Sequence, residues 1–495
     1  MTYLGIDIGT GSSKGVLTDH AGTVLREARR DHTTSNPRPG WFEHDAQEVW
    51  WGDVVALSRE LLDGADGPVS AVCVSGIGPA VVVTGDDDEP LRPAILYGID
   101  TRCARQADAM NASIGEDTLI ERVGNVLSTQ SLGPKLQWIA DEEPDTWRRA
   151  RRMYSAPGWV VRRLTGEYTL DRYSASTSDP VYDLTRRDWW EQGWQPYDQL
   201  ERPRLAWPAE VVGEVSAAGA EATGIPRGTP VTAGTIDAMA EAYSVGCQEP
   251  GDTMVMYGST LFLIQVTEAM VPSTHLWAAE GRTGDVFSLA AGMATGGLVT
   301  TWLTETLGRG YAELAQAAAG VRPGSDGLLL LPYFAGERTP IFDPQARGAW
   351  TGMTLNHTPG HLYRSALEGI AMGVRHNLEA MHSSGAGARR LVAVGGGTAQ
   401  RLWTQVVSDV TGLPQDLPTL TVGASYGDAR MAADALGEDT SSWNPVAERL
   451  EPDPAAKEIY DRLFDLYVEA YTASAGTMHG LGGLDADARS RWPDR

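Results

Sequence analysis

Two short turns built from glycine and hydroxyl residues could bind phosphate. One lies between two apolar runs near the start of the chain, directly after Asp7, and consists of Gly9, Thr10, Gly11, Ser12, Ser13 and Lys14. The other, also between apolar runs, consists of Gly258, Ser259 and Thr260. Small residues let main-chain N–H groups approach a phosphate closely, and Ser and Thr hydroxyls add donors. An ordinary hairpin turn would show the same local pattern, so each turn alone leaves both interpretations open.

Asp237 is the candidate catalytic carboxylate of the chain. It follows the apolar segment 231–234 and lies in a segment of helical composition, 235–242. A helix N-terminus favours the ionised form of a carboxylate, and Gly234 and Ala238 leave room for a substrate beside it. Such a group could orient a hydroxyl and accept its proton. An N-capping aspartate would give the same pattern.

Asp100 and Arg102 form a second polar site. They follow an apolar run and stand at a predicted helix start. A polar sugar needs carboxylate and guanidinium partners of this kind, held rigidly at the end of an element. The alternative is a helix-capping aspartate and a surface arginine.

Three adjacent acids, Asp86, Asp87 and Asp88, resemble a metal site. They follow a predicted strand at 80–84, and Asp is common in tight turns. We therefore favour a solvated hairpin tip over a metal site.

The spacing of apolar residues predicts two α/β domains of similar design. Each begins with a strand meander that contains one of the two turns, and each continues with a helix and a further buried strand. The predicted domains are 1–247 and 251–440, and 441–495 forms a closing helix with a polar tail. The main expected elements are a meander over 3–30, a helix from 49 to 62, strands at 69–74, 252–257, 261–266, 286–290 and 390–394, and a helix over 296–307.

Composition excludes some partners. The 495 residues carry a formal net charge of −25, which disfavours binding to nucleic acid or to anionic membranes. No apolar run approaches the roughly 20 residues of a spanning helix, and the N-terminus reads as a strand rather than a secretion signal. Three widely spaced cysteines, Cys73, Cys103 and Cys247, fit a reducing cytoplasm and no zinc site.

Two longer motifs are more specific than the turns. Residues 131–140 place Lys135 and Trp138 at a predicted helix start, and residues 348–368 read GAWTGMTLNHTPGHLYRSALE. Their order and spacing resemble the two signatures of the FGGY family of carbohydrate kinases, and the resemblance extends from Tyr3 to about Leu436. It implies two ribonuclease-H-like domains of the actin-like ATPase fold flanking a catalytic cleft, with ATP, Mg²⁺ and a small sugar as ligands.

The resemblance also implies roles for particular residues. Asp237 would be the catalytic base, and Asp7 with Asp237 would serve Mg²⁺. Nucleotide would be bound by both turns and by the glycine-rich segment after 390–394, through Gly396, Gly397 and Gln400. Sugar would be bound by Gly76, Ile77, Gly78, Asp100, Arg102, Asp237, Glu337 and Arg338.

The expected reaction is transfer of the ATP γ-phosphate to a terminal hydroxyl of an open-chain sugar, with a pentulose such as xylulose as first choice. Two departures limit this choice: Ile77-Gly78-Pro79 replaces the usual Met-His pair, and Tyr97 replaces a tryptophan that normally lies one residue closer to the Asp. Another ketose, a polyol or an aldonate is the alternative within the family. An actin-like ATPase and a sugar-sensing protein without activity are the alternatives outside it. A homodimer is one expected assembly.

Overall fold

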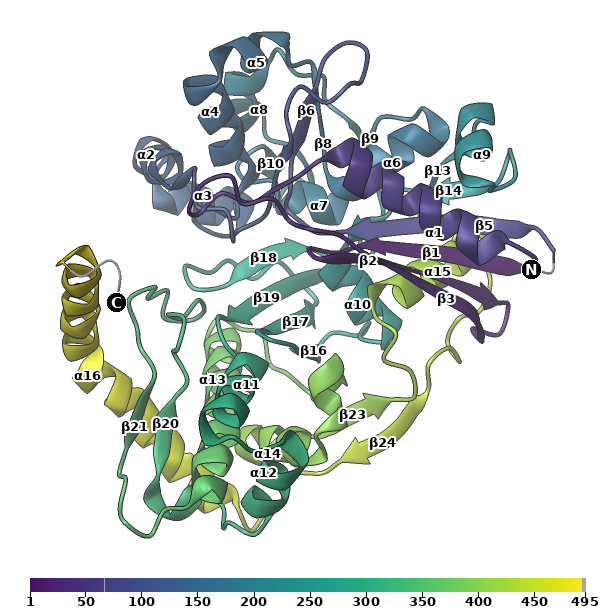
Figure 1. Ribbon diagram of the computed structural model, residues 1–495. Helices are drawn as coiled ribbons and strands as arrows, with labels where there is room; N and C mark the ends of the chain where they lie inside the picture. The colour runs from purple at the N-terminus through teal and green to yellow at the C-terminus, as the bar shows by residue number, and fades with distance from the viewer. Residues whose placement is uncertain (66, 492–495) are drawn as a thin grey trace. The chain divides into compact units, whose positions relative to one another are not determined.

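The computed structural model describes residues 1–65 and 67–491, with side chains up to residue 484. The chain forms two compact units (Figure 1). The first comprises residues 1–250, 266–289 and 422–445, and the second comprises 251–265, 290–421 and the chain from 446. The predicted domains were continuous in sequence, whereas the chain returns to the first unit twice. No described helix combines the length and the apolar character needed to cross a bilayer.

The first unit is built on a mixed sheet of seven strands. Strand β1 (Thr2–Ile8) pairs antiparallel with β2 (Ser12–Asp19) and parallel with β5 (Val69–Gly76). This arrangement confirms the predicted meander and the buried parallel strand. The order β13-β14-β5-β1-β2-β3 is completed by β3 (Val24–Asp31), β13 (Val211–Glu214) and β14 (Pro230–Thr232), with β15 (Thr235–Ile236) on β5.

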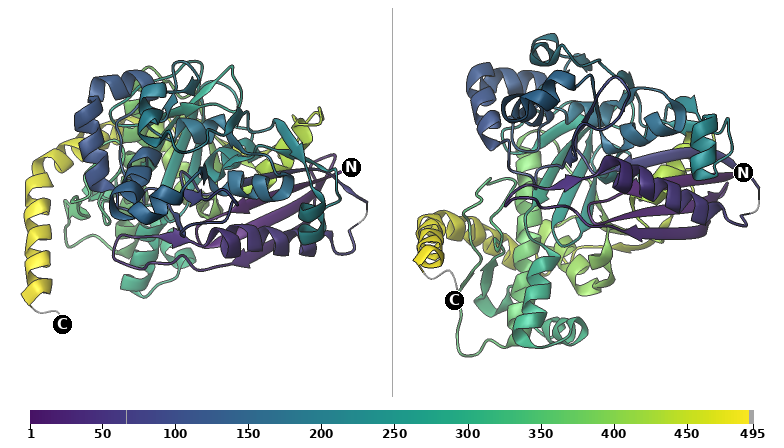
Figure 2. Two further views of the ribbon diagram at one scale, coloured as in Figure 1. Left: turned by 90° about the horizontal axis from the view of Figure 1, so that it is seen from above. Right: turned by 45° about the horizontal axis from the view of Figure 1, so that its top comes forward.

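Helices cover both faces of this sheet (Figures 1 and 2). Helices α1 (Gly52–Leu62) and α6 (Ala156–Thr165) pack on one face, and α10 (Asp237–Ser244) and α15 (Ala424–Asp434) on the other. Two glycines permit this close packing. A Cβ at Gly5 would lie 2.0 Å from the Ser425 carbonyl of α15, and one at Gly15 would lie 2.7 Å from Leu61 of α1.

The remaining elements of the first unit form a largely helical layer around residues 104–200. A second hydrophobic core, with Trp138 and Tyr197 among its members, holds this layer together. Its helices are α2 (Ala104–Ile114), α3 (Glu116–Val123), α4 (Leu132–Glu142), α5 (Pro144–Arg149), α7 (Arg172–Ser176) and α8 (Glu191–Trp194); α9 (Ala217–Thr223) packs against α1 and α6. Short strands connect them: β4 (Glu43–His44), β6 (Val82–Thr84), β7 (Ala94–Ile95), β8 (Arg152–Tyr154), β9 (Thr169–Asp171), β10 (Tyr182–Asp183), β11 (Asp188–Trp189) and β12 (Arg204–Ala206). Strand β18 (Trp277–Glu280), which lies beside α7, was not indicated by the sequence.

The second unit repeats the plan. Its central strand β16 (Asp252–Tyr257) pairs antiparallel with β17 (Leu261–Thr267) and parallel with β22 (Arg390–Val394). The sequence predicted these three strands. Strands β19 (Phe287–Met293), β23 (Gln415–Pro418) and β24 (Val446–Leu450) extend the sheet, and β20 (Leu329–Leu331) pairs with β21 (Ala349–Thr351). The helices are α11 (Gly297–Leu307), α12 (Tyr311–Ala319), α13 (Pro359–Ser383), α14 (Arg401–Thr411) and α16 (Lys457–Arg491).

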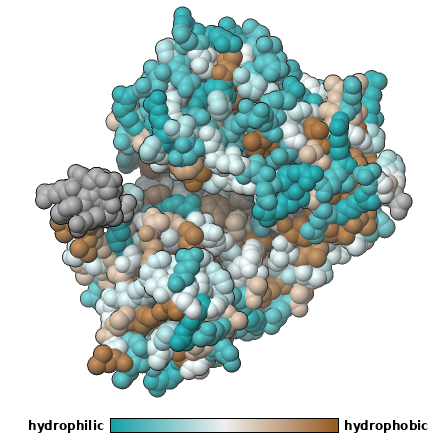
Figure 3. All heavy atoms as spheres, in the orientation of Figure 1, coloured by the Kyte–Doolittle hydropathy of each residue, from teal (hydrophilic) through white to brown (hydrophobic). Residues whose placement is uncertain are grey.

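Hydrophilic residues predominate on the molecular face drawn in Figure 3, and hydrophobic ones are scattered in small groups. This pattern agrees with the acidic composition, in which 65 Asp and Glu residues face 40 Lys and Arg residues. A surface with a net charge of one sign remains soluble by self-repulsion.

Candidate active site

The first glycine-rich turn joins β1 to β2 and is very tight. The N–H of Gly9 donates to the Ser12 carbonyl at 3.1 Å, and a Cβ at Gly9 would lie only 2.6 Å from that oxygen. Position 9 therefore requires glycine. Gly11, by contrast, is exposed and has no atom within 4 Å of its would-be Cβ. The outer side of the turn is thus open for a ligand.

Two consecutive carbonyls of this turn are anchored to the protein. Nε2 of His32 lies 3.1 Å from the Gly9 oxygen and 3.2 Å from the Thr10 oxygen. The Thr10 oxygen also accepts from the Thr34 hydroxyl at 2.6 Å and lies 3.1 Å from Nε2 of His44. In a trans peptide the C=O and the next N–H point in opposite directions. The N–H groups of Thr10 and Gly11 therefore point away from these anchors, and among the described residues neither donates to a protein acceptor.

The second turn, in the other unit, is similar but one residue shorter. Gly258 N–H donates to the Thr260 carbonyl at 3.1 Å, whereas Gly9 N–H donates to Ser12 at the same distance. The carbonyls of Gly258 and Ser259 are also anchored, here by the first N–H groups of α11: Gly297 donates to Gly258, and Gly296 donates to Ser259, both at 2.9 Å. The N–H groups of Ser259 and Thr260 consequently point outward.

The glycine-rich segment after β22 lies in this same unit. Gly395 has a φ of +94°, which favours glycine, and a Cβ at Gly396 would meet nothing within 4 Å. Gln400 precedes α14, and its side-chain oxygen accepts from the Tyr363 hydroxyl at 2.9 Å. The segment Gly396–Ala399 is a turn of 3-10 helix, and it places an open main-chain position at Gly396 near the fixed amide of Gln400.

A cluster of carboxylates occupies the face of the first sheet that α10 and α15 cover. It contains Asp7 on β1, Asp237 and Glu241 on α10, and Asp428 on α15. Burial raises the pKa of Asp7 to about 6, although Lys14 and Ser75 act in the opposite direction. Burial, followed by the charge of Asp7, raises the pKa of Glu241 to about 7 and the pKa of Asp237 well above its usual value. Acids so close together favour a shared cation or shared protons.

Asp237 is the first residue of α10. Ile236 occupies the N-cap position, and Asp237 Oδ1 accepts from the neighbouring Ala238 N–H at 2.7 Å. The carboxylate therefore contacts the helix N-terminus without being a conventional cap. It lies on the same sheet face as Asp7, and the charges of the two groups affect each other.

Asp428 anchors the end of β5 beside Asp7. Its Oδ2 accepts from the Ser75 hydroxyl at 2.7 Å and from the Ser75 N–H at 3.2 Å. Ser75 pairs in register with Asp7 and lowers the pKa of that carboxyl. Oδ1 of Asp7 is buried and has no protein partner among the described residues, so one oxygen of the carboxylate is available to a ligand.

The structure places Asp100 and Arg102 inside the fold. Both side chains are fully buried, and they form a tight ion pair at 2.7 Å. Asp100 also accepts from the Phe42 N–H, and Arg102 donates to Glu43 at 2.7 Å. The guanidinium lies 4.2 Å from the ring centre of Trp41. These charges are satisfied within the protein and support the surrounding loops, and their contact with a sugar stays a prediction.

Two further sugar positions also lie inside the fold. Ile77 is 1% exposed, and its N–H continues the sheet by donating to Ile8 at 2.9 Å. A Cβ at Gly76 would lie 3.0 Å from Ala156 of α6. Gly78 is partly exposed and precedes the cis Pro79. Of the three predicted positions, only Gly78 is partly exposed.

Glu337 and Arg338 belong to the second unit. Glu337 is 5% exposed, and its Oε1 accepts from the N–H groups of Ala294 and Arg338 at 2.6 and 2.8 Å. Burial raises the pKa of Glu337 to about 7. Arg338 donates to the Met293 carbonyl at 2.8 Å. Both side chains hold the loop against the end of β19, and their contact with a sugar stays a prediction.

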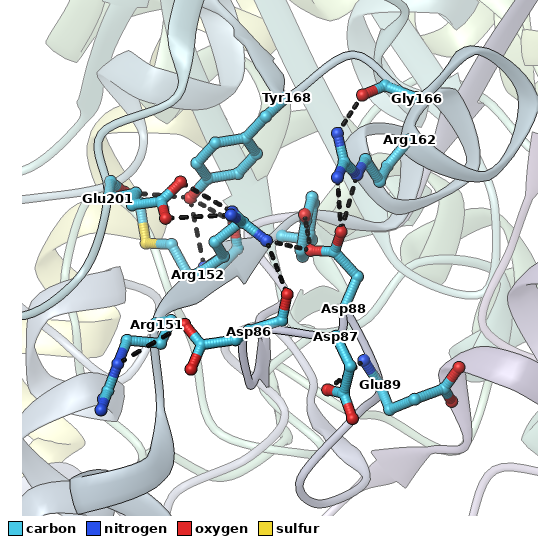
Figure 4. A network of polar contacts seen from close by, with 12 residues as sticks. Asp86, Asp87, Asp88, Glu89, Arg151, Arg152, Arg162, Gly166, Tyr168 and Glu201 are labelled. Carbon is cyan, nitrogen blue, oxygen red and sulfur yellow. Dashed lines mark hydrogen bonds and ion pairs between the residues drawn. The ribbon is translucent and has the colours of Figure 1, made fainter.

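The predicted solvated hairpin tip at Asp86, Asp87 and Asp88 is only partly exposed to solvent. Asp86 and Asp87 are exposed, whereas Asp88 accepts from Arg152 at 2.9 Å, from Tyr154 at 2.6 Å and from Arg162 at 2.5 Å (Figure 4). Arg152 also pairs with Glu201, as Figure 4 shows. Across the described residues, no group of three or more His, Cys, Asp or Glu side chains could hold a metal ion alone.

Sequence reasoning missed the residues that support the site. Ser75 and Asp428 are 353 residues apart, so no local pattern connects them. His32 and Asp53, whose side chains meet at 2.7 Å, follow no motif. The run 40–45 contains His44 and is recognisable as a loop before a helix, but nothing in it indicates a contact with the first turn.

Comparison with known proteins identifies the chain. The N-terminal domain of the FGGY family of carbohydrate kinases matches residues 2–244, and the C-terminal domain matches 253–436. The chain belongs to the FGGY family of carbohydrate kinases. This FGGY kinase is therefore a phosphotransferase that uses ATP and a sugar, as the sequence predicted, and the two mixed α/β units confirm the predicted fold class.

Several relatives of this FGGY kinase match over most of their length. It is 27% identical to a xylulose kinase of Escherichia coli K12 over 93% of this chain and 98% of that protein. It is 32% identical to a glycerol kinase of Alkalilimnicola ehrlichii over 88% and 90%. The crystal structure of a xylulose kinase from Rhodospirillum rubrum has a TM-score of 0.91 at 30% identity, with 97% of this chain and all of that chain covered.

Proposed function

We propose that both glycine-rich turns bind phosphate groups of ATP through their outward N–H groups. Thr10 and Gly11 in the first turn and Ser259 and Thr260 in the second supply these donors. The supporting observation is the shared construction: in each turn two consecutive carbonyls are anchored on the opposite side. Such nests of N–H groups favour anions. The hydroxyls of Ser12 and Ser259 and the ammonium of Lys14 add to the site.

The adenosine part of ATP would lie against the glycine-rich segment of the second unit. The open space at Gly396 admits a flat group close to the main chain. The Gln400 amide is fixed by Tyr363. Gly397 packs against Trp403 and Tyr257, since a Cβ there would lie 2.6 and 2.9 Å from them. This packing of Gly397 holds the glycine-rich segment in place on the side away from the proposed adenosine.

Mg²⁺ fits the carboxylate cluster. Mg²⁺ is usually held by one or two carboxylates together with phosphate oxygens and water. Asp7 has a buried oxygen without a protein partner, and Asp237 lies on the same sheet face. These two residues would hold the ion directly or through water. Bound Mg²⁺ would neutralise phosphate charge and favour the ionised forms of both carboxylates.

Asp237 would act as the general base. Phosphoryl transfer needs positioning, charge neutralisation and a group that takes the hydroxyl proton. Oδ1 of Asp237 is held by the Ala238 N–H at 2.7 Å, which leaves Oδ2 to accept the proton from the attacking sugar hydroxyl. Its raised pKa makes it a stronger base than an ordinary aspartate once it is ionised.

The preferred substrate would be an open-chain pentulose such as xylulose. The full-length similarity to xylulose kinases supports this choice. The 32% identity to a glycerol kinase supports a polyol as the second candidate. Ile77-Gly78-Pro79 stands in place of the usual Met-His pair and contains no histidine, so the carbonyl end of the sugar would be bound by other groups. The three buried free cysteines fit a cytoplasmic enzyme, and a homodimer stays a prediction.

The test is ADP release with a panel of pentuloses, hexuloses, polyols and aldonates in the presence of Mg²⁺-ATP. A kinase of this type responds to one class with saturable kinetics. Stimulation by xylulose over glycerol supports the first choice, and the reverse order supports the second. Sugar-independent ADP release would contradict the proposed reaction, and so would the absence of turnover with every sugar tested.

A further inference from the structure

His32 makes hydrogen bonds through both ring nitrogens, and every partner is an acceptor. Nδ1 lies 2.7 Å from Asp53 Oδ2, and Nε2 faces the carbonyls of Gly9 and Thr10. Ser13 Oγ donates to the same Asp53 oxygen at 2.7 Å, which shows that this oxygen is an acceptor. A neutral imidazole can donate from only one nitrogen. Both sets of contacts are therefore satisfied only when the ring is protonated on both nitrogens.

The surroundings of His32 favour this cationic form. The side chain is 8% exposed, and that of Asp53 is 14% exposed. Burial acts to lower the pKa of His32, but the hydrogen bond and charge of Asp53, together with the two carbonyls, outweigh it and raise the pKa. The titratable groups facing the ring are Asp53 from α1 and His44 from β4.

His44 provides an internal contrast. Its ring lies edge-on to that of His32, with the centroids 5.0 Å apart. Trp50 Nε1 donates to its Nδ1 at 3.2 Å, so this nitrogen is an acceptor, and its Nε2 can donate to the Thr10 carbonyl at 3.1 Å. One neutral tautomer satisfies both contacts. Burial and the neighbouring charge of His32 lower the pKa of His44 to about 4.

We propose that His32 is a positioning residue for ATP: its imidazolium, held by Asp53, fixes the carbonyls of Gly9 and Thr10 so that the N–H groups of Thr10 and Gly11 face the phosphates. This inference rests on the proposed function of the turn. In the second unit the amides of α11 anchor the equivalent carbonyls of Gly258 and Ser259. In the first turn a protonated histidine anchors these carbonyls instead. It also places a positive charge on the side of the turn opposite the proposed phosphate.

The proposal predicts that affinity for ATP depends on pH, with weaker binding at high pH. A histidine whose pKa is raised in the folded protein keeps its stabilising contacts at low pH and loses them as the pH rises through that raised pKa. A neutral ring has one donor for two sets of acceptors. When that donor stays with Asp53, the Gly9 carbonyl loses its imidazole contact and the Thr10 carbonyl keeps only the contacts of Thr34 and His44. Affinity for ATP falls over that pH range, and by linkage bound ATP raises the pKa of His32 further.

The test uses the full chain and a non-hydrolysable ATP analogue with Mg²⁺, titrated calorimetrically at pH 7.0, 8.0 and 9.5. His32→Gln removes the charge, and His20→Gln, at an exposed histidine of the same unit, is the control. We expect wild type and His20→Gln to bind more weakly as the pH rises. We expect His32→Gln to bind about three- to tenfold more weakly at pH 7.0 and to match wild type at pH 9.5.

Asp53→Asn provides a second, independent variant, because it keeps the ring in place and removes the partner charge. Like His32→Gln, it should weaken binding of the ATP analogue at pH 7.0. Nitrogen-15 NMR of the labelled histidines in the ligand-free protein tests the protonation directly, and His32→Gln assigns the signal. A neutral His32 ring at pH 7.0 would overturn the inference, and so would equal affinities of His32→Gln and wild type at that pH. Absence of nucleotide binding by wild type would instead overturn the proposed function of the turn.

Discussion

Asp428 Oδ2 accepts hydrogen bonds from both the hydroxyl and the main-chain N–H of Ser75, at 2.7 and 3.2 Å. The two residues come from α15 and β5, which lie far apart in the sequence. Ser75 in turn pairs in register with Asp7. A buried carboxylate therefore fixes the end of β5, the strand that pairs with β1 beside the proposed Mg²⁺ ligand Asp7.

Asp428→Ala should reduce both stability and turnover. It leaves two buried donors of Ser75 without an acceptor, which costs about 1–3 kcal/mol for each unsatisfied group. Asp428→Asn keeps one side-chain oxygen and should be milder. Denaturant unfolding and steady-state kinetics measure the two effects. Wild-type stability and wild-type kcat in Asp428→Ala would contradict this role.

The stability of the ligand-free protein should depend on pH through the carboxylate cluster. The folded-state pKa values of Asp7 and Glu241 are raised to about 6 and 7, and that of Asp237 is raised further. A carboxyl with a raised pKa stabilises the fold below its unfolded pKa, and the contribution is lost as pH rises through the folded value. The cluster thus destabilises the fold as the pH rises from about 4 to above 7.

Other acids of the chain have lowered pKa values and stabilise the fold as the pH rises. The effect of Asp237 is therefore measured as the difference in melting temperature between wild type and one variant. Melting temperatures of wild type and Asp237→Asn are compared across pH 5–8, with and without Mg²⁺-ATP. We expect the difference to grow in favour of Asp237→Asn as the pH rises, and to shrink with ligand. A difference that is constant with pH would exclude a charge penalty at Asp237.

Arg102→Leu should unfold or strongly destabilise the protein. Removing one partner of a buried ion pair leaves Asp100 without its cation and typically costs about 3–5 kcal/mol, whereas Glu43 keeps its ion pair with Arg92. Arg105→Leu is the matched control, because Arg105 is 75% exposed and pairs with Glu142 on the surface. A stable Arg102→Leu protein that has lost only its sugar affinity would restore the sugar-binding interpretation.

Asp88→Ala should destabilise the first unit, by about 1–3 kcal/mol for the lost charged hydrogen bonds. Its carboxylate holds Arg152, Tyr154 and Arg162 together, and its side chain is only 15% exposed. Asp86→Ala changes an exposed neighbour with a single 3.8 Å ion pair and should be nearly neutral. Equal unfolding free energies for the two variants would show that the network contributes little.

The sequence predicted the parts of the fold that depend on local pattern. The strand–turn–strand units around Gly9 and Gly258 follow from apolar runs on either side of glycine and hydroxyl residues, and the buried strand at 69–74 follows from a continuous apolar run. The family signatures then indicated the chemistry. Strand β18 was not predicted, because it is short and lies between polar loops.

The support of the site could not be predicted, since it depends on contacts between distant segments. Asp428 and Ser75 meet only because the chain returns to the first unit at 422–445. Asp100 and Arg102 show a further limit: residue types that suit a sugar also suit a buried ion pair, and the sequence does not reveal that both side chains are buried. Glu337 is buried as well, and it accepts from two main-chain N–H groups.

The most direct test of the account is kcat of Asp237→Asn with the preferred sugar and saturating Mg²⁺-ATP. Asn keeps an oxygen for the Ala238 N–H but cannot accept the hydroxyl proton. We expect a folded protein that binds ATP and sugar, with kcat lower by about 10²–10⁴. A folded Asp237→Asn enzyme that turns over within a few-fold of wild type would contradict the assignment of Asp237 as the base.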